Sequence, residues 1–324
     1  MNFWTDRRVA VTGGAGFLGR FVVRKLRERG CRQIFVPRRS DHDLREPEAV
    51  RRMYEIASPD LVIHLAGSVG GIGANQRYPG RFFYDNLVMG AHLLEQARRF
   101  DVPKFVGIGS VCAYPMSTPV PFREENLWDG YPEETNAAYG LAKKTMLVQG
   151  QAYRTEYGYN AIHLLLSNLY GPGENLDPET SHGLASIVRK FVDARFQGHG
   201  HVTLWGDGSP TREFLYVEDA AEGILLASEC YDLPEPVNLG SGVEISIRDL
   251  AAKIASLAGF DGRIHWDRNR PNGQPRRCVD VSRAKRHFGF EAATTLEEGL
   301  RRMISWYEKQ TRKAQTQSDL QKTG

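Results

Sequence analysis

The chain has 324 residues, of which 41% are hydrophobic and 25% are charged, and its formal net charge is +3. A chain of this length forms either one large α/β unit or two lobes that share a cleft, and we expect two lobes. The composition excludes disordered, collagen-like and disulfide-scaffold proteins. Because the basic residues occur in short, scattered clusters, the charge gives no reason to predict a nucleic-acid partner.

The cysteines and the N-terminus indicate where the protein works. Cys31, Cys112, Cys230 and Cys278 are far apart and form no CxxC pair, so we expect reduced thiols, no metal site and a cytoplasmic protein. Residues 1–8 carry charges where a signal peptide needs an apolar segment. Since no stretch approaches the roughly 18 uninterrupted apolar residues of a transmembrane helix, we expect no membrane association.

The first predicted strand, at residues 9–12, runs into a glycine-rich turn and then into a helical pattern that reaches Leu26. Longer periodic segments, such as residues 91–100, separate the strands that follow. These further strands are predicted at residues 34–36, 61–65, 105–108 and 161–166. Strands that alternate with helices predict an α/β fold with a parallel, doubly wound sheet of the Rossmann type.

A loop rich in Gly, Pro, Asp and Asn interrupts this pattern after residue 172 and begins a second, smaller α/β lobe. Later helices are predicted at residues 184–195, 246–258 and 296–307. Residues 310–324 contain one large apolar residue and no helical period, so they are predicted to form a disordered tail.

The predicted domain boundaries are discontinuous, because residues 214–217 and 236–239 look like elements that return to the first lobe. The first domain is therefore expected to comprise residues 1–175 and about 214–240. The second lobe is expected to comprise residues 176–213 and 241–309.

Gly13, Gly16 and Gly19 follow the first strand at GxxGxxG spacing, and Phe17 and Leu18 lie within the same loop. Glycines at these positions let the turn tighten, let the backbone approach a pyrophosphate and let a helix N-terminus face its charge. A plain strand-to-helix turn is the alternative. The position directly after the first strand favours dinucleotide binding.

Arg38 and Arg39 follow the second strand, where an NAD enzyme carries an acidic residue for the ribose 2′-hydroxyl. Two arginines suit a 2′-phosphate, so the sequence favours NADP over NAD. A solvated basic turn is the alternative. Asp43 is interpreted either as an adenine contact or as a helix-capping carboxylate.

Tyr139 and Lys143 are spaced by one helical turn, which places both side chains on one face of a helix. An ammonium group near a phenol favours the phenolate, so we expect Lys143 to lower the pKa of Tyr139 and suit it to proton transfer. A YxxxK pair alone is typical of many exposed helices. Ser110 strengthens the case, because it follows a predicted strand at the sheet edge where α/β proteins bind ligands.

Together these features resemble the extended short-chain dehydrogenase/reductase family, whose members act mostly on nucleotide sugars. The resemblance covers about residues 7–309 and includes the segments HLAG at 64–67 and NLYGP at 168–172. It implies a first domain that binds NADP(H), with Leu65 and Ala66 among the contacts, and a second lobe that binds the nucleotide sugar. It also implies a homodimer.

Narrower motifs resemble the branch of that family that converts GDP-4-keto-6-deoxy-D-mannose to GDP-L-fucose, by epimerisation at C3 and C5 and NADPH-dependent reduction at C4. These motifs lie at residues 69–79, 109–115, 181–183, 205–221 and 272–284. The resemblance implies that Cys112 is the base and His182 the acid of the epimerisation. It implies that Ser110 and Tyr139 hold the carbonyl oxygen, and that Tyr139 and Lys143 serve the reduction.

The same resemblance implies contacts with a GDP-sugar substrate from Asn168, Lys190, Trp205, Arg212 and Arg277. By residue type alone, Cys112 is better explained as a small buried hydrophobe, and the cations are explained as surface charges. His182 also fits a loop or helix-capping residue. Two other enzyme functions remain open: a C4 epimerase with tightly held NAD, and a plain 4-ketoreductase of another nucleotide sugar. A cofactor-sensing binding protein without turnover is the non-enzymatic alternative.

Overall fold

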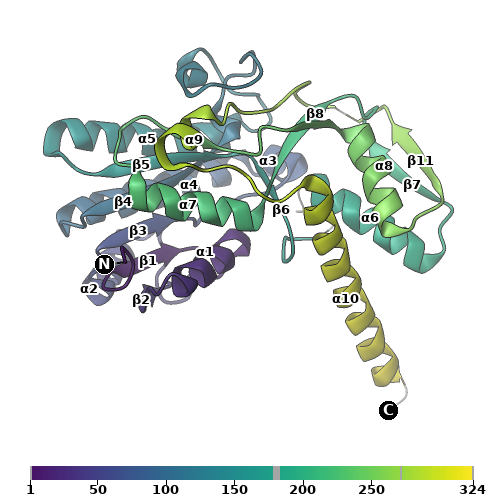
Figure 1. Ribbon diagram of the computed structural model, residues 1–324, viewed down its shortest axis with the longest axis horizontal. Coiled ribbons are helices and arrows are strands. Elements are labelled where there is room, and N and C mark those ends of the chain that lie inside the picture. Colours follow the sequence, from purple (N-terminus) through teal and green to yellow (C-terminus); the bar gives the residue numbers. More distant parts are fainter. Residues whose placement is uncertain (1, 178–182, 271, 323–324) are drawn as a thin grey trace.

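The computed structural model describes residues 2–177, 183–270 and 272–322 (Figure 1). The strands are β1 (Arg8–Thr12), β2 (Gln33–Phe35), β3 (Leu61–His64), β4 (Lys104–Ser110), β5 (Ala161–Leu166), β6 (Asn168–Tyr170), β7 (His201–Trp205), β8 (Thr211–Tyr216), β9 (Val237–Leu239), β10 (Glu244–Ser246) and β11 (Arg263–Asp267). The α-helices are α1 (Phe17–Glu28), α2 (Pro47–Ala57), α3 (Ile72–Arg77), α4 (Pro79–Arg99), α5 (Ala137–Tyr157), α6 (Gly183–Gln197), α7 (Val217–Cys230), α8 (Ile247–Ala258), α9 (Ser282–Phe288) and α10 (Leu296–Lys322). Two short 3₁₀ helices are η1 (Val111–Ala113) and η2 (Glu124–Trp128).

A six-stranded sheet with the order β2-β1-β3-β4-β5-β9 forms the larger part of the molecule. All its neighbouring strands are parallel. β3 and β5 are buried along their whole length, as expected of parallel strands whose two faces are both covered by helices. The prediction of a parallel, doubly wound sheet is confirmed. All six strands end at one edge, on which ligands bind in such folds.

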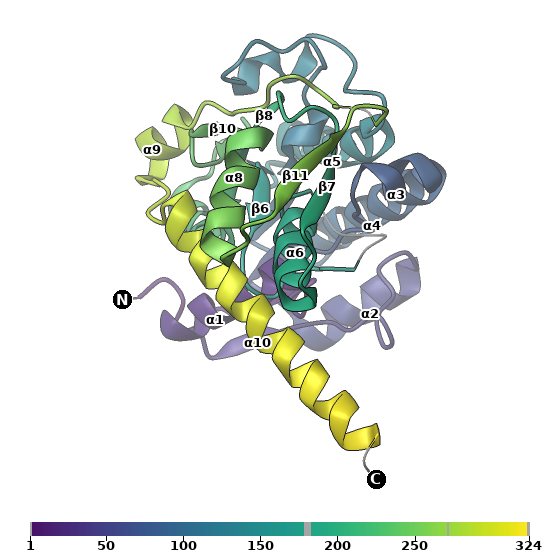
Figure 2. The ribbon, with the colours of Figure 1, turned by 90° about the vertical axis from the view of Figure 1, so that its right-hand side faces the viewer.

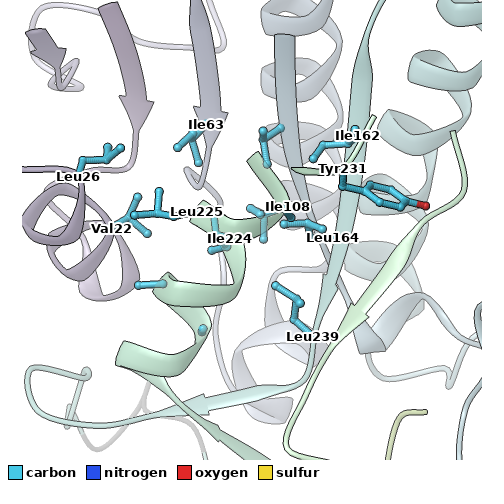
Figure 3. Packing of buried hydrophobic residues seen from close by; sticks show 14 of the residues in the cluster. Val22, Leu26, Ile63, Ile108, Ile162, Leu164, Ile224, Leu225, Tyr231 and Leu239 are labelled. Carbon is cyan, nitrogen blue, oxygen red and sulfur yellow. The ribbon is translucent and has the colours of Figure 1, made fainter. Parts of the chain in front are cut away.

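Alternate residues of the strands build two separate cores. On one face Ile63, Ile108 and Leu164 pack against α1 and α7 (Figure 3). On the other face Val62 and Phe105 pack against α2, α4 and α5. Strands that are apolar on both faces therefore require helices on both sides, and the sequence supplies them between successive strands.

A second region is built from α6, α8 and α10, which lie beside the β7–β11 pair (Figure 2). Phe191, Leu250 and Leu300 are fully buried where these helices meet. Ser246 caps α8 because its side chain accepts a hydrogen bond from the Asp249 backbone N–H, as the sequence predicts for this helix start. β6, β8 and β10 form a three-stranded sheet between this region and the larger one.

The elements after residue 210 are divided between the two regions. α7 packs against α1, and β9 joins the larger sheet beside β5. β8, in contrast, pairs with β6 and β10 in the small sheet. The exact domain boundaries stay a prediction.

The closing helix is longer than predicted. α10 begins at Leu296, as expected, but continues to Lys322 and extends away from the body of the molecule (Figures 1 and 2). The prediction of a disordered tail from residue 310 is therefore wrong for residues 310–322. Once packing has nucleated a helix, the Lys, Ala and Gln residues that follow are good helix formers and extend it without an apolar period.

All four cysteines are free, which confirms the prediction of unpaired thiols. Within residues 2–177, 183–270 and 272–322, no helix combines the length and the apolar character needed to cross a membrane.

Candidate active site

Ser110 is the last residue of β4 and also the N-cap of η1. Its hydroxyl oxygen accepts a hydrogen bond from the backbone N–H of Cys112 at 3.2 Å. This contact turns the chain as it leaves the sheet and holds Cys112 at the carboxyl end of the strand. The predicted position of Ser110 at this edge is confirmed.

α5 approaches η1 so closely that only glycine fits at residue 140. A Cβ atom on Gly140 would lie 2.3 Å from the backbone carbonyl oxygen of Cys112. Tyr139, the preceding residue, is hydrogen-bonded to the Ser110 side chain and lies close enough to the Cys112 thiol to interact with its charge. The structure thus brings Ser110, Cys112 and Tyr139 together, as the sequence predicts.

The electrostatics of Tyr139 differ from the prediction. Burial raises the pKa of the Tyr139 phenol, proximity to Cys112 raises it further, and the hydrogen bond with Ser110 lowers it in part. The expected lowering of this pKa by Lys143 is wrong, because desolvation of the phenolate dominates and Lys143 is not among the groups that shift it. The phenol therefore keeps its proton at neutral pH, which is the form that donates.

Lys143 lies one helical turn further along α5 and is buried. Burial lowers its pKa to about 8. Its Nζ atom lies beside the loop that follows β3, since a Cβ atom on Gly67 would be 3.5 Å from it. A buried ammonium group at this edge of the sheet can bind ribose hydroxyls and hold a nearby proton donor.

Arg277 contacts the thiol of Cys112 directly. Its Nη1 atom donates to Cys112 Sγ at 3.5 Å, and its Nε and Nη2 atoms donate to Gln274 Oε1 at 3.2 and 3.0 Å. Gln274 is fixed in turn by a bond from its Nε2 atom to the carbonyl oxygen of Met116 at 3.1 Å. The guanidinium group is thereby held against the sulfur atom.

Arg212 lies in the same charged neighbourhood. Burial and the charge of Arg277 lower its pKa to about 10, while Cys112 and Glu133 act in the opposite direction. Among the residues that the structure describes, neither Arg212 nor Arg277 has a carboxylate within ion-pair distance. Two largely buried cations without a carboxylate partner fit an anionic ligand such as a diphosphate.

The predicted acid, His182, belongs to residues 178–182, which lie outside the part of the chain that the structure describes. Its role stays a prediction.

The glycine-rich loop has the shape that a dinucleotide requires. Gly13 has a φ of 69°, and a Cβ atom on Gly19 would lie 2.1 Å from the carbonyl oxygen of Gly13. α1 begins directly after Gly16, and no side chain caps its N-terminus. The backbone N–H groups of its first turn, at Phe17 and Leu18, are therefore available to a pyrophosphate, and this loop fits NADP(H).

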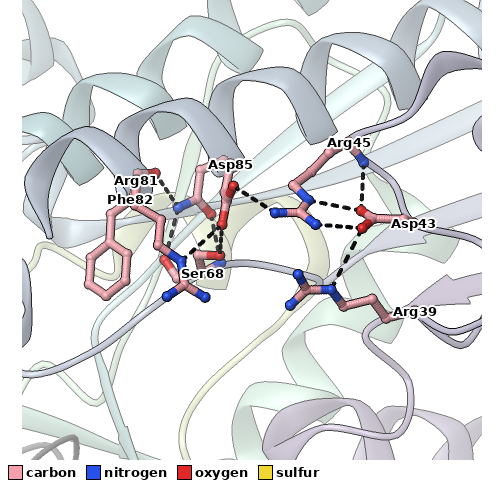
Figure 4. A network of polar contacts seen from close by, with 8 residues as sticks. Arg39, Asp43, Arg45, Ser68, Arg81, Phe82 and Asp85 are labelled. Atoms are coloured by element: carbon pink, nitrogen blue, oxygen red, sulfur yellow. Dashed lines mark hydrogen bonds and ion pairs between the residues drawn. The ribbon is translucent and has the colours of Figure 1, made fainter.

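The predicted adenosine end of the cofactor site lies at the loops after β2 and β3. Arg38 and Arg39 are exposed. Asp43 is bound by Arg45 instead of standing free (Figure 4). Leu65 and Ala66 face the glycine loop, since a Cβ atom on Gly13 would lie 2.7 Å from the Ala66 nitrogen.

Of the remaining predicted substrate contacts, two are hydrogen-bonded to the backbone and one is exposed. Asn168 donates from Nδ2 to the carbonyl oxygen of Glu213 at 2.9 Å, and Lys190 donates to that of Thr203 at 2.8 Å. Trp205 ends β7 with 54% of its surface exposed, and the guanidinium group of Arg270 lies 4.9 Å from the centre of its ring. An exposed indole at a strand end provides a flat surface on which a base can stack.

Residues 9–240 match the sequence profile of the NAD dependent epimerase/dehydratase family. The chain belongs to this family. The GDP-L-fucose synthase of Sinorhizobium fredii is 38% identical over 300 residues, which are 93% of this chain and 95% of the relative. GDP-L-fucose synthase 1 of Arabidopsis thaliana is 37% identical over 300 residues, 93% of each chain. The solved structure of a GDP-L-fucose synthetase from Naegleria fowleri bound to NADP is 27% identical, with a TM-score of 0.86 and coverage of 96% of this chain and 97% of that one.

Three contributors to this epimerase/dehydratase site escaped the sequence interpretation. Gln274 lies within the motif at residues 272–284, but its hydrogen bond with Arg277 depends on the fold. The need for glycine at residue 140 arises only when α5 meets η1. Arg45 has a sequence signal, since an arginine two residues after Asp43 can turn back onto its carboxylate, but that carboxylate was assigned to other roles.

Proposed function

We propose that this protein uses NADP(H) to convert GDP-4-keto-6-deoxy-D-mannose to GDP-L-fucose, by epimerisation at C3 and C5 followed by reduction at C4. The observation that carries the proposal is the grouping of Ser110, Cys112, Tyr139 and Lys143 at the carboxyl end of β4, with Arg277 on the thiol. The names of the relatives and the fit of the glycine loop support the same reading.

The C4 ketone of the substrate acidifies the hydrogens at both neighbouring carbons. The Cys112 thiolate removes the proton at C3 or C5, and the negative charge moves to the C4 oxygen as the enolate forms. The hydroxyl groups of Ser110 and Tyr139 donate hydrogen bonds to that oxygen. Reprotonation from the opposite face inverts the carbon, and we assign this step to His182.

The reduction uses the same oxygen site. When NADPH is bound, it supplies the hydride that C4 receives. Tyr139 donates its phenolic proton to the C4 oxygen, which becomes the hydroxyl group of the product. The charged Lys143 stabilises the phenolate that remains and binds the cofactor ribose.

We assign the diphosphate of the substrate to Arg212 and Arg277, whose charges lack carboxylate partners among the described residues. Trp205, Lys190 and Asn168 are proposed to line the rest of the nucleotide-sugar site. We also propose a cytoplasmic homodimer. Its support is the apolar surface exposed on the adjacent helices α4 and α5, at Phe83, Tyr84 and Val148.

The activity is tested by incubating the protein with the substrate and NADPH in D₂O. We expect oxidation of NADPH together with entry of deuterium at C3 and C5. Oxidation without deuterium would indicate a plain 4-ketoreductase. Ligand binding without any turnover would indicate a sensor, and both results would contradict the proposed reaction.

Two variants separate the steps. Cys112→Ala is expected to lower deuterium entry by about 10²-fold or more, since general base catalysis contributes at least that much, but to spare reduction of an already epimerised ketone. Tyr139→Phe is expected to lower reduction by a similar factor. Cys230→Ala is the matched control, because that exposed thiol ends α7. Equal loss of both steps in Cys112→Ala would show that the assigned roles are wrong.

A further inference from the structure

Asp43 and Arg45 form a closed pair in the loop between β2 and α2. Arg45 donates from Nε to Oδ1 of Asp43 at 3.0 Å and from Nη2 to Oδ2 at 2.6 Å, and its backbone N–H also donates to Oδ1 at 3.1 Å (Figure 4). Both carboxylate oxygens are therefore occupied. Such a two-pronged contact is stronger and better oriented than an ordinary surface ion pair.

The guanidinium group of Arg45 is anchored on its other side. Its Nη1 atom lies 3.5 Å from Oδ1 of Asp85, a buried residue of α4. Asp85 also accepts a hydrogen bond from the Ser68 hydroxyl at 2.8 Å, and Arg81 lies 3.7 Å from it. This network links the loops that follow β2 and β3, so Arg45 cannot leave Asp43 without breaking contacts to a second element.

Arg39 is the other neighbour of Asp43. Its Nε atom is 3.7 Å from Oδ2 of Asp43, a loose contact, and its side chain is 68% exposed. Hydrogen bonds from Arg45 lower the pKa of Asp43 to about 2, so this carboxylate is ionised at any working pH. Without Arg45, a full negative charge would stand beside Arg39. Both residues lie in the loop after β2, the strand at whose end NAD enzymes place a carboxylate for the ribose 2′-hydroxyl.

We propose that Arg45 determines the cofactor preference of this site, because it neutralises Asp43 and leaves Arg39 free to bind a 2′-phosphate. This inference rests on the proposed use of NADP(H). Arg45 acts through Asp43 and Arg39, so it is a positioning residue. Its loss exposes a carboxylate that repels the 2′-phosphate, competes for Arg39 and accepts a hydrogen bond from a 2′-hydroxyl.

The test compares the dissociation constants of 2′,5′-ADP and 5′-AMP, which differ only in the 2′-phosphate. Both constants are measured by calorimetry on the full chain, and their ratio is the preference for 2′,5′-ADP. In Arg45→Leu we expect the preference for 2′,5′-ADP to fall about tenfold, the size of one partly screened charge interaction. In Asp43→Asn/Arg45→Leu we expect the preference to return to within about twofold of the original, because the carboxylate is gone. Arg45→Gln, which keeps a hydrogen-bond donor for Asp85, is expected to behave like Arg45→Leu.

Arg51→Leu is the matched control, because this substitution removes the same charge. Arg51 lies on α2 and forms ion pairs with the exposed residues Glu48 and Glu55. Equal weakening of both ligands in Arg45→Leu and Arg45→Gln would mean that Arg45 only shapes the loop, and would overturn the inference. Failure of the double variant to recover would overturn it as well. An original protein that shows no preference for 2′,5′-ADP would instead overturn the proposed cofactor.

Discussion

Lys143 shows how strongly the chemistry of one side chain depends on its burial. In water the ammonium group would stay mostly charged up to about pH 10, but burial brings the pKa of Lys143 to about 8. The proposed role in reduction needs the charged form, which stabilises the phenolate of Tyr139. We therefore expect Lys143 to set the alkaline side of the activity profile.

We expect the rate of the reductive step to fall as the pH rises through about 8, the pKa of Lys143. The rate should be about tenfold lower at pH 9 than at pH 7, because the fraction of charged Lys143 falls about tenfold between these values. The measurement is single-turnover oxidation of NADPH against pH with the epimerised ketone. Lys143→Arg keeps its charge throughout this range, so its profile is expected to stay flat, whatever its absolute rate. An unchanged decline in that variant would assign the titration to another group.

Residue types at the site were predictable, but their partners were not. The sequence predicts Ser110, Cys112, Tyr139 and Lys143 because each belongs to a local motif. The contact between Arg277 and Cys112 joins residues that are 165 positions apart, and no local pattern encodes it. The burial of a side chain likewise depends on the assembled fold and not on a local pattern, which explains why the pKa of Tyr139 differs from its prediction.

At the scale of elements, the site depends on how closely α5 approaches η1. Hydrophobic periodicity predicts the helix and the strand that carry Tyr139 and Ser110, but not the distance between them. That distance is fixed by Gly140, whose missing side chain leaves room for the carbonyl group of Cys112. The packing of two backbones is a property of the assembled fold, and a sequence pattern gives only the elements.

Gly140→Ala is expected to lower the free energy of unfolding by about 1–3 kcal/mol, because the new methyl group meets backbone that cannot move without shifting η1. We expect kcat/KM to fall by about 10²-fold, since Cys112 and Tyr139 move apart. Gly80→Ala is the control: residue 80 lies in α4, and apart from its chain neighbours and the backbone of its own helix no atom lies within 4 Å of the added methyl group. Alanine is also the better helix former. Urea unfolding and turnover of both variants provide the comparison, and equal effects would refute the argument from close approach.

At the scale of the whole molecule, the segment that carries Arg277 connects the two regions. Backbone hydrogen bonds join Glu213 of β8 to Arg277 at 3.1 Å, and join Phe122 to Cys278 and Asp280 at 2.8 and 2.9 Å. Asn238 of β9 is fully buried beside this segment. Its side chain accepts a bond from the Tyr114 hydroxyl at 2.7 Å and donates to the carbonyl oxygens of Phe122 and Asp280 at 2.9 and 3.2 Å.

Asn238→Leu is expected to lower the free energy of unfolding by about 3 kcal/mol, because it leaves several buried polar groups without partners. Deuterium entry into the substrate should fall, since both Cys112 and Arg277 depend on these loops, whereas binding of 2′,5′-ADP at the opposite end of the sheet should persist. Asn269→Leu, at an exposed position, is expected to change the stability by less than about 0.5 kcal/mol. Loss of 2′,5′-ADP binding in Asn238→Leu would instead indicate general unfolding.

The larger sheet was the most predictable part of the molecule, since its strands are continuous apolar runs bounded by turn residues. The order of the smaller sheets was not, because β6, β8 and β10 are short and β8 is only partly buried. The helical continuation of α10 beyond residue 309 was missed for a related reason, since a helix can extend without an apolar face once its beginning is packed.

The position of Arg277 so late in the chain has a consequence for how the protein is made. β1 to β9 include every strand of the larger sheet, and all of them are synthesised before Arg277. The thiol of Cys112 receives its guanidinium partner only after the segment beyond β11 has emerged. The nascent chain therefore contains every strand of the larger sheet before the contact between Cys112 and Arg277, which lie 165 residues apart, can form.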